Sequence, residues 1–246
     1  QMLCIELCVS NMEAITLAKD LKIDRVEVCQ NLESGGVTPS ATLVQLAIDS
    51  GLKTHVLIRP RIGGFIYSQK ELELIEKEIS YFASIGVDGI VIGALLSDHR
   101  INYKFIESIR KDYPNLDMTF HKAFDDTPDW KASIDVLAES GVNRILSSGC
   151  ASNVIKGMTT LKSMIEYAPG KIEILPGGGL NENNMDFFLK NVKPDWIHFS
   201  GCKKIYDRSS SIFETERLTF DKERIQKMVK MSKDYSFSIG AISSDI

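Results

Sequence analysis

The sequence predicts a single (β/α)8 barrel, the TIM barrel architecture of the α/β class, spanning residues 1–246. Short apolar segments alternate with amphipathic helical patterns along nearly the whole chain, which indicates parallel strands joined by helical crossovers. Eight such units follow one another without a linker or a low-complexity segment. A chain of 246 residues is also of ordinary length for one barrel of this kind.

Each predicted strand is an apolar run bounded by residues that favour turns. The eight candidates are residues 2–9, 24–29, 53–59, 88–93, 116–121, 143–148, 171–175 and 195–200. A weak internal repeat supports the alternation, because GVDGI at 86–90 and GVNRI at 141–145 each join a helix end to a strand through a glycine C-cap. Eight strands favour a closed barrel over an open sheet.

Two helices and one loop can be placed from local signals. The helix after the second strand is expected to start with Thr38 as its N-cap and Pro39 in its first position. The last helix covers DKERIQKMVKM at 221–231, and the apolar residues that share one of its faces are Ile225, Met228 and Val229. Residues 201–219 show no clear periodicity, so we expect a long loop after the eighth strand and consider it a candidate lid.

Composition excludes several classes of function. A net charge of −4 argues against a nucleic-acid partner and against a polybasic membrane anchor. Apolar runs such as IVIGALL at 90–96 fall far short of the ~20 residues of a membrane helix, and no signal peptide opens the chain. Five cysteines, an odd number, do not form a disulfide framework. We therefore expect a cytoplasmic protein, with a homo-oligomer left open.

Glu6 stands in the apolar first strand, LCIELCV at 3–9, between Cys4 and Cys8. Alternation places the leucines and the isoleucine of this strand against the helices and turns Glu6 into the barrel. The same parity predicts further inward side chains: Arg25, Glu27, Cys29, His55, Arg59, Asp117, Thr119, His121, Trp196, His198 and Ser200. Buried charges must meet one another or a ligand. Both a purely structural ion-pair network and a ligand site remain open.

The C-terminal ends of the strands carry most of the titratable residues, and barrel enzymes build their active sites at this end. These residues are Cys8, Cys29, Arg59, Arg61, His121, Lys122, Asp125, Ser148, His198 and Ser200. The segments LPGGGLNENN and HFSGCKK follow strands seven and eight, where barrels often bind phosphate. They predict an anion site formed by Gly177, Gly178, Gly179, Ser200 and Gly201, although a glycine run is also compatible with a plain loop.

A metal site is the competing interpretation of the same end of the barrel. Cys8 and Cys29 end neighbouring strands, and thiols with imidazoles suit Cu(I) or zinc. His121 or His198 would complete the set of ligands. The chain has no CxxC or HxxxH spacing, so the site would be assembled from separate strands.

Several motifs together resemble the CutC copper homeostasis family. They span residues 3–201 and comprise ELC, RVEVC followed by ESGGVTPS, RPRIGGFIYS, TFHKAFD, ILSSG and HFSG. The resemblance implies a cytoplasmic (β/α)8 barrel with a role in copper handling. It directs attention to Glu6, Glu27, Cys29, Arg59, Arg61, His121 and Asp125. Two departures from the family pattern are Gly64 in place of an aspartate and Lys122 in place of an arginine.

Two functional hypotheses follow, and neither requires an organic cofactor. In the first, the barrel mouth binds copper(I) through Cys8 and Cys29 with one of the two histidines. The alternative is a lyase or isomerase for a small phosphorylated or carboxylated metabolite. Its catalytic set would be Glu6 or Glu27 as the base, His121 as the acid, Lys122 or Arg59 as the stabiliser of negative charge, and Arg61 and Asp125. A scaffold without catalysis would instead pair all its polar groups internally.

Overall fold

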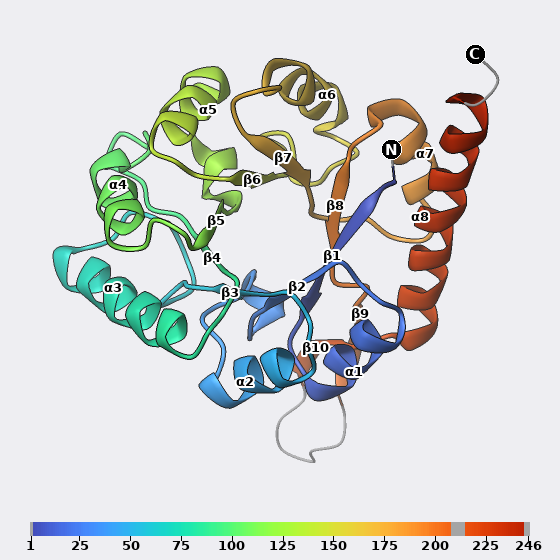
Figure 1. Ribbon diagram of the computed structural model, residues 1–246, viewed down its shortest axis with the longest axis horizontal. Coiled ribbons are helices and arrows are strands. Elements are labelled where there is room, and N and C mark those ends of the chain that lie inside the picture. The colour runs from blue at the N-terminus through green and yellow to red at the C-terminus, as the bar shows by residue number, and fades with distance from the viewer. Residues whose placement is uncertain (1, 208–214, 244–246) are drawn as a thin grey trace.

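The computed structural model describes residues 2–207 and 215–243, and its centre is a ring of eight parallel strands (Figure 1). In sequence these are β1 (Cys4–Val9), β2 (Arg25–Val28), β3 (Thr54–Leu57), β4 (Gly89–Ile92), β5 (Asp117–Phe120), β6 (Arg144–Ser147), β7 (Glu173–Pro176) and β8 (Trp196–Phe199). From β1 to β7 each strand pairs with the next one in sequence, and β8 pairs with β1. A bridge between Gly177 and His198 joins β7 to β8, so the predicted barrel is confirmed as nearly closed.

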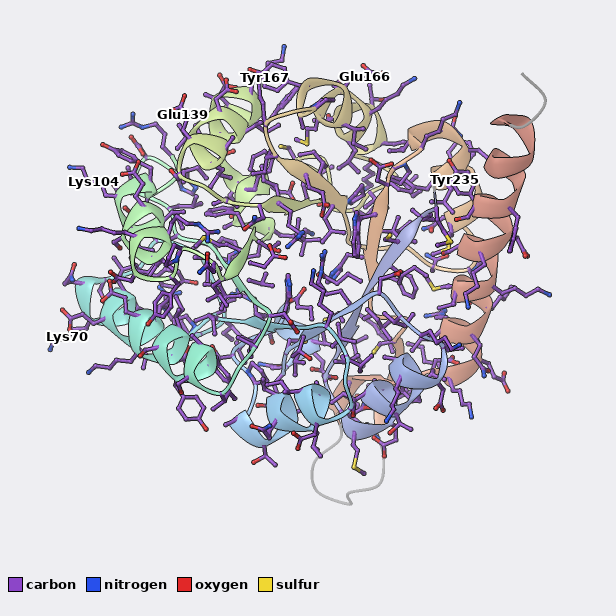
Figure 2. All side chains as sticks on the ribbon, in the orientation of Figure 1. Lys70, Lys104, Glu139, Glu166, Tyr167 and Tyr235 are labelled. Atoms are coloured by element: carbon purple, nitrogen blue, oxygen red, sulfur yellow. The ribbon has the colours of Figure 1, made fainter. Side chains whose placement is uncertain are left out.

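Helices surround this ring on its outside (Figure 1). They are α1 (Met12–Asp20), α2 (Ala41–Asp49), α3 (Gln69–Ser84), α4 (Tyr103–Asp112), α5 (Trp130–Glu139), α6 (Met158–Tyr167), α7 (Met185–Val192) and α8 (Lys222–Ser243), with short 3-10 helices η1 (Leu32–Ser34) and η2 (Lys122–Asp126). Figure 2 shows Lys70, Lys104, Glu139 and Glu166 at the outer rim, on α3 to α6. Within the described ranges, none of these helices combines the length and apolar composition needed to cross a bilayer.

The start of α2 differs from the sequence prediction. Ser40, not Thr38, is the N-cap, and its side chain accepts a hydrogen bond from the Leu43 N–H. The Thr38 hydroxyl is engaged elsewhere, because it accepts the Arg59 N–H at 2.9 Å and donates to Glu78 Oε2 at 2.9 Å. Thr38 therefore connects the end of β3 to α3, and the next residue with a capping oxygen starts the helix.

We expected a long loop over residues 201–219, of which 208–214 lie outside the described residues, and the described parts are not irregular. They contain two antiparallel strands, β9 (Lys203–Asp207) and β10 (Thr215–Thr219), in a register that pairs Thr219 with Lys203. The Leu218 N–H donates to Glu33 Oε1 at 2.8 Å, which connects this hairpin to η1. These strands pair mainly through the backbone and bury little, so they lack the apolar alternation that marks a strand in sequence. The role of the segment as a lid stays a prediction.

The inward and outward faces of the strands follow the predicted parity. Outward side chains such as Leu7, Val26 and Val56 are fully buried between the strands and the helices. The inward side chains of Glu6 and Arg25 are fully buried as well, in the interior of the barrel. The inner face thus carries charge inside an apolar shell, and this arrangement positions the candidate site.

Candidate functional site

Glu6 lies at the centre of a buried polar cluster. Strand register places Arg25 of β2 and His198 of β8 directly beside it. Arg25 Nε forms a hydrogen-bonded ion pair with Glu6 Oε2, and His198 Nδ1 lies 2.8 Å from Glu6 Oε1. The Arg25 guanidinium also stacks 4.1 Å from the centre of the Trp196 ring. The acid in the first strand is therefore compensated by two bases from neighbouring strands.

The thiols of Cys8 and Cys29 lie closer to the C-terminal end of the strands. Their sulfur atoms are 3.2 Å apart, and both residues are buried, with Cys8 5% exposed and Cys29 0% exposed. Cys8, Glu27 and His198 bring potential ligand atoms within 4.8 Å of one another. His121 lies outside this cluster. The structure therefore brings the predicted ligands Cys8 and His198 together and adds the carboxylate of Glu27, whereas Cys29 adjoins this group through its contact with the Cys8 sulfur.

Burial and charge shift the pKa values of this cluster in opposite directions. Burial opposes ionisation of Glu6, but the His198 hydrogen bond and the Arg25 charge hold its pKa below the usual range. Glu27 is also buried and lies near Glu6, and its pKa is raised to about 7 despite the proximity of His198. Burial by itself would lower the pKa of His198, but the hydrogen bond with Cys8 and the charges of Glu27 and Glu6 raise it above the usual value. The hydrogen bond with Cys29, together with burial, raises the pKa of the Cys8 thiol.

A cavity of about 140 Å³ opens beside the thiols, and Arg59, His121 and Lys122 line it together with Cys8 and Glu27. The Arg59 guanidinium donates to three backbone carbonyls, those of Ser34, Gly36 and Gly63. His121 Nδ1 accepts the Ala123 N–H at 3.1 Å. Arg59 Nε and His121 Nε2 are buried and have no hydrogen-bond partner among the described residues.

A second cavity, of about 340 Å³, shares Cys8, Lys122 and His198 with the first. Its lining includes most of the predicted anion-binding residues, namely Gly178, Gly179, Ser200 and Gly201. Gly177 does not line it, and a Cβ atom there would lie 2.9 Å from His198 Cβ. Gly177 is thus needed for the close approach of β7 and β8.

Four predicted site residues lie outside both cavity linings, namely Glu6, Gly177, Arg61 and Asp125. The last two are each engaged in holding a loop. Arg61 pairs with Glu71 of α3 and donates to the carbonyls of Gly64 and Ile66. Asp125 accepts four hydrogen bonds from the end of β6 and the segment that follows it, from Ser147 Oγ, Ser148 N, Ser148 Oγ and Cys150 N. Arg61 and Asp125 therefore hold loops at the barrel mouth in position.

Phe65 lines the first cavity although it was not among the predicted site residues. Its ring centre lies 5.0 Å from the Arg59 guanidinium carbon and 4.9 Å from the centre of the His121 ring. Arg224 of α8 lines the second cavity and pairs with Glu182. Phe65 belongs to the RPRIGGF motif and could have been found there, whereas no local pattern connects α8 to the barrel mouth.

Comparison with known proteins identifies the family of this chain. The model of the CutC family matches residues 3–203. The chain belongs to the CutC family. The resemblance of its sequence motifs to that family is thereby confirmed.

Individual CutC relatives agree with this assignment. The CutC family protein of Pasteurella multocida is 35% identical over 198 residues, which cover 80% of this chain and 81% of that protein. The human copper homeostasis protein cutC homolog is 36% identical over 197 residues, which cover 80% of this chain and 72% of that protein. The crystal structure of CutC from Streptococcus agalactiae aligns with a TM-score of 0.75 at 34% identity, covering 80% of this chain and 98% of that one.

More distant structures share only the fold. Phosphoribosylanthranilate isomerase from Thermotoga maritima aligns with a TM-score of 0.58 at 12% identity, covering 95% of this chain and all of that one. At this identity the likeness confirms the barrel and carries no statement about chemistry.

Proposed function

We propose that this CutC protein is a cytoplasmic copper homeostasis protein that binds Cu(I) at its barrel mouth through Cys8, Cys29 and His198. The observation that carries the proposal is the 3.2 Å separation of the two buried sulfur atoms, of which that of Cys8 lies within 4.8 Å of a His198 ring nitrogen. Thiolate and imidazole are the soft and borderline ligands that Cu(I) prefers. Relatives of the chain, including the human protein, are named copper homeostasis proteins. Five free cysteines among the described residues fit a reducing compartment.

The separation of the sulfur atoms is compatible with a shared ion. With metal–sulfur bonds of about 2.3 Å, two ligands of a tetrahedral ion lie about 3.8 Å apart. The sulfur atoms, now 3.2 Å apart, would have to separate by about 0.6 Å. A χ1 rotation of about 20° on one cysteine, or about 10° on each, achieves this within the rotamer well and without moving the strands.

Glu6 prepares His198 for coordination. Because His198 Nδ1 faces the Glu6 carboxylate at 2.8 Å, Nε2 is the ring nitrogen left for an ion. A carboxylate that holds the second nitrogen of a ligating histidine is the usual outer-shell arrangement of metal sites, since it fixes the orientation and tautomer of the ring. The buried Glu6 thereby acquires a role that an apolar residue could not supply.

The test is a competitive Cu(I) titration against a chromophoric chelator without oxygen. The native chain should bind one Cu(I) tightly, and Cys8→Ser with Cys29→Ser should lose this binding. The matched control is Cys4→Ser with Cys150→Ser, which removes the same number of thiols away from the cluster. Equal Cu(I) affinity in the native chain and the Cys8/Cys29 variant would disprove the proposal.

A second candidate function is a lyase or isomerase that acts on a small anionic metabolite. It is favoured by one observation: Glu27, His121 and Lys122 line the same cavity, so a base, a hydrogen-bond donor and a cation surround one volume. The test is incubation in D2O with phosphorylated and carboxylated metabolites, followed by NMR. Exchange of a substrate C–H that Glu27→Gln abolishes would support it, and no exchange with any compound would count against it.

A further inference from the structure

The barrel mouth carries more positive charge than its acids balance. Glu6 and Glu27 lie beside Arg25 and His198, so these four groups compensate one another. Arg59 and Lys122 line the same cavity, and no carboxylate of the described residues lies within ion-pair distance of either. The chain as a whole has a net charge of −4, so this local excess is not a property of its general surface.

Arg59 is the stronger case, because it is only 6% exposed. Three backbone carbonyls satisfy its terminal nitrogens, which fixes the position of the guanidinium. Carbonyls neutralise no charge, however, and burying a cation without a counter-charge is costly. Its Nε remains without a hydrogen-bond partner. A fixed, buried guanidinium with a free donor suits an anion that comes from outside the chain.

His121 adds a neutral donor to the same cavity. Burial and the charge of Arg59 lower its pKa to about 3, so the ring is uncharged at neutral pH. Nδ1 accepts the Ala123 N–H, and the hydrogen of the neutral ring therefore resides on Nε2. Nε2 is buried without an acceptor, and His121 is only 5% exposed. An unpaired buried N–H is expensive unless a ligand accepts from it.

Lys122 brings the third donor from the opposite side of the mouth. A Cβ atom built on Gly178 would lie 3.1 Å from Lys122 Nζ, so the ammonium group lies beside the loop that follows β7. Lys122 lines both cavities at the mouth. Gly178 has φ +107°, a conformation that favours glycine, and without a Cβ its backbone allows the ammonium group to approach closely.

We propose that Arg59, His121 and Lys122 form a binding site for a small oxyanion, the phosphate or carboxylate group of a small molecule. The cavity volume of about 140 Å³ is several times the ~30 Å³ that one water molecule occupies, which suits a group of a few heavy atoms. The adjoining cavity of about 340 Å³ has room for the rest of the molecule. The site does not depend on Cu(I), so it goes beyond the proposed copper site. It occupies the cavity of the second candidate function and rests on that candidate for the anionic class of its ligand.

The test uses inorganic phosphate and malonate as probes, in calorimetry and thermal unfolding at constant ionic strength. At a probe concentration of ten times its Kd, we expect the native chain to unfold about 3 °C higher. Lys122→Met should weaken binding about tenfold or more, because a charge-assisted hydrogen bond is lost. Lys104→Met is the matched control, because Lys104 is an exposed lysine on α4, and its Kd should match that of the native chain.

The outcomes separate the two sources of the anion and the two proposals. Binding of phosphate alone indicates a phosphorylated ligand, and binding of malonate alone indicates a carboxylate. No binding of either probe, or equal Kd values for Lys122→Met and Lys104→Met, would overturn the site. If Lys122→Met does not fold, Lys122→Gln gives the same comparison. A Cu(I) titration of the native chain reports on the thiols alone, so either proposal can fail while the other stands.

Discussion

The buried Glu6–Arg25 pair should dominate the stability of the barrel interior. Both side chains are fully buried, and Glu6 is the one carboxylate among the described residues within ion-pair distance of Arg25. Arg25 Nη1 and Nη2 have no hydrogen-bond partner among the described residues, so the Glu6 contact and the Trp196 ring are its compensation. Glu6→Gln keeps the shape of the side chain but removes the charge. Arg25 would then be left as a buried cation without an ion-pair partner.

Breaking a buried pair from one side costs about 3–5 kcal/mol. In a domain of this size each kcal/mol lowers the melting temperature by about 2–4 °C, so Glu6→Gln should melt about 6–20 °C below the native chain. The assay is thermal and urea unfolding followed by circular dichroism. Asp186→Asn is the control, because its pair with Lys190 is exposed and its removal should leave the melting temperature unchanged.

The double variant Glu6→Gln with Arg25→Met separates the pair from other effects. Removing both charges should recover much of the loss, because an apolar replacement of both partners of a buried pair is often neutral. A loss below about 1 kcal/mol in Glu6→Gln would refute the reasoning. So would a double variant as unstable as the sum of the two single variants, because the two residues would then act independently.

Three further predictions concern protons and a helix cap. The Glu27 pKa is raised to about 7, so the folded protein binds this proton more tightly than the unfolded chain does. The free energy of unfolding should therefore fall as the pH rises from about 4.5 to 7. Glu27→Gln should remove this part of the pH dependence, as measured by urea unfolding. The pKa of Cys8 is raised, so Cu(I) must displace a tightly held proton to bind its thiolate. The Cu(I) affinity should therefore increase with pH between 6 and 8. A pH-independent affinity in the chelator competition would contradict a Cys8 thiolate ligand. Ser40→Ala should cost about 1 kcal/mol by removing the N-cap of α2, and a variant as stable as the native chain would contradict this cap.

Local patterns determined the architecture and the contents of the barrel interior. The alternation of apolar strands with amphipathic helices is repeated in each unit, so eight units can be identified from the sequence without knowledge of tertiary contacts. Side-chain parity within one strand is equally local, because successive residues point to opposite faces. It was therefore possible to predict that Glu6, Arg25 and His198 point inward, and the structure confirms this.

Tertiary structure decided which of these inward residues meet. Glu6 and His198 are 192 residues apart, and only the stagger of β8 against β1 places them at one level. The register of β1 against β2 brings Cys8 to 3.2 Å from Cys29, whereas Arg61 turns outward to Glu71. The β9–β10 hairpin also escaped prediction, because its pairing depends on the partner strand more than on burial. Parity is a property of one strand, but register is a property of the closed barrel, and no single segment of sequence contains it.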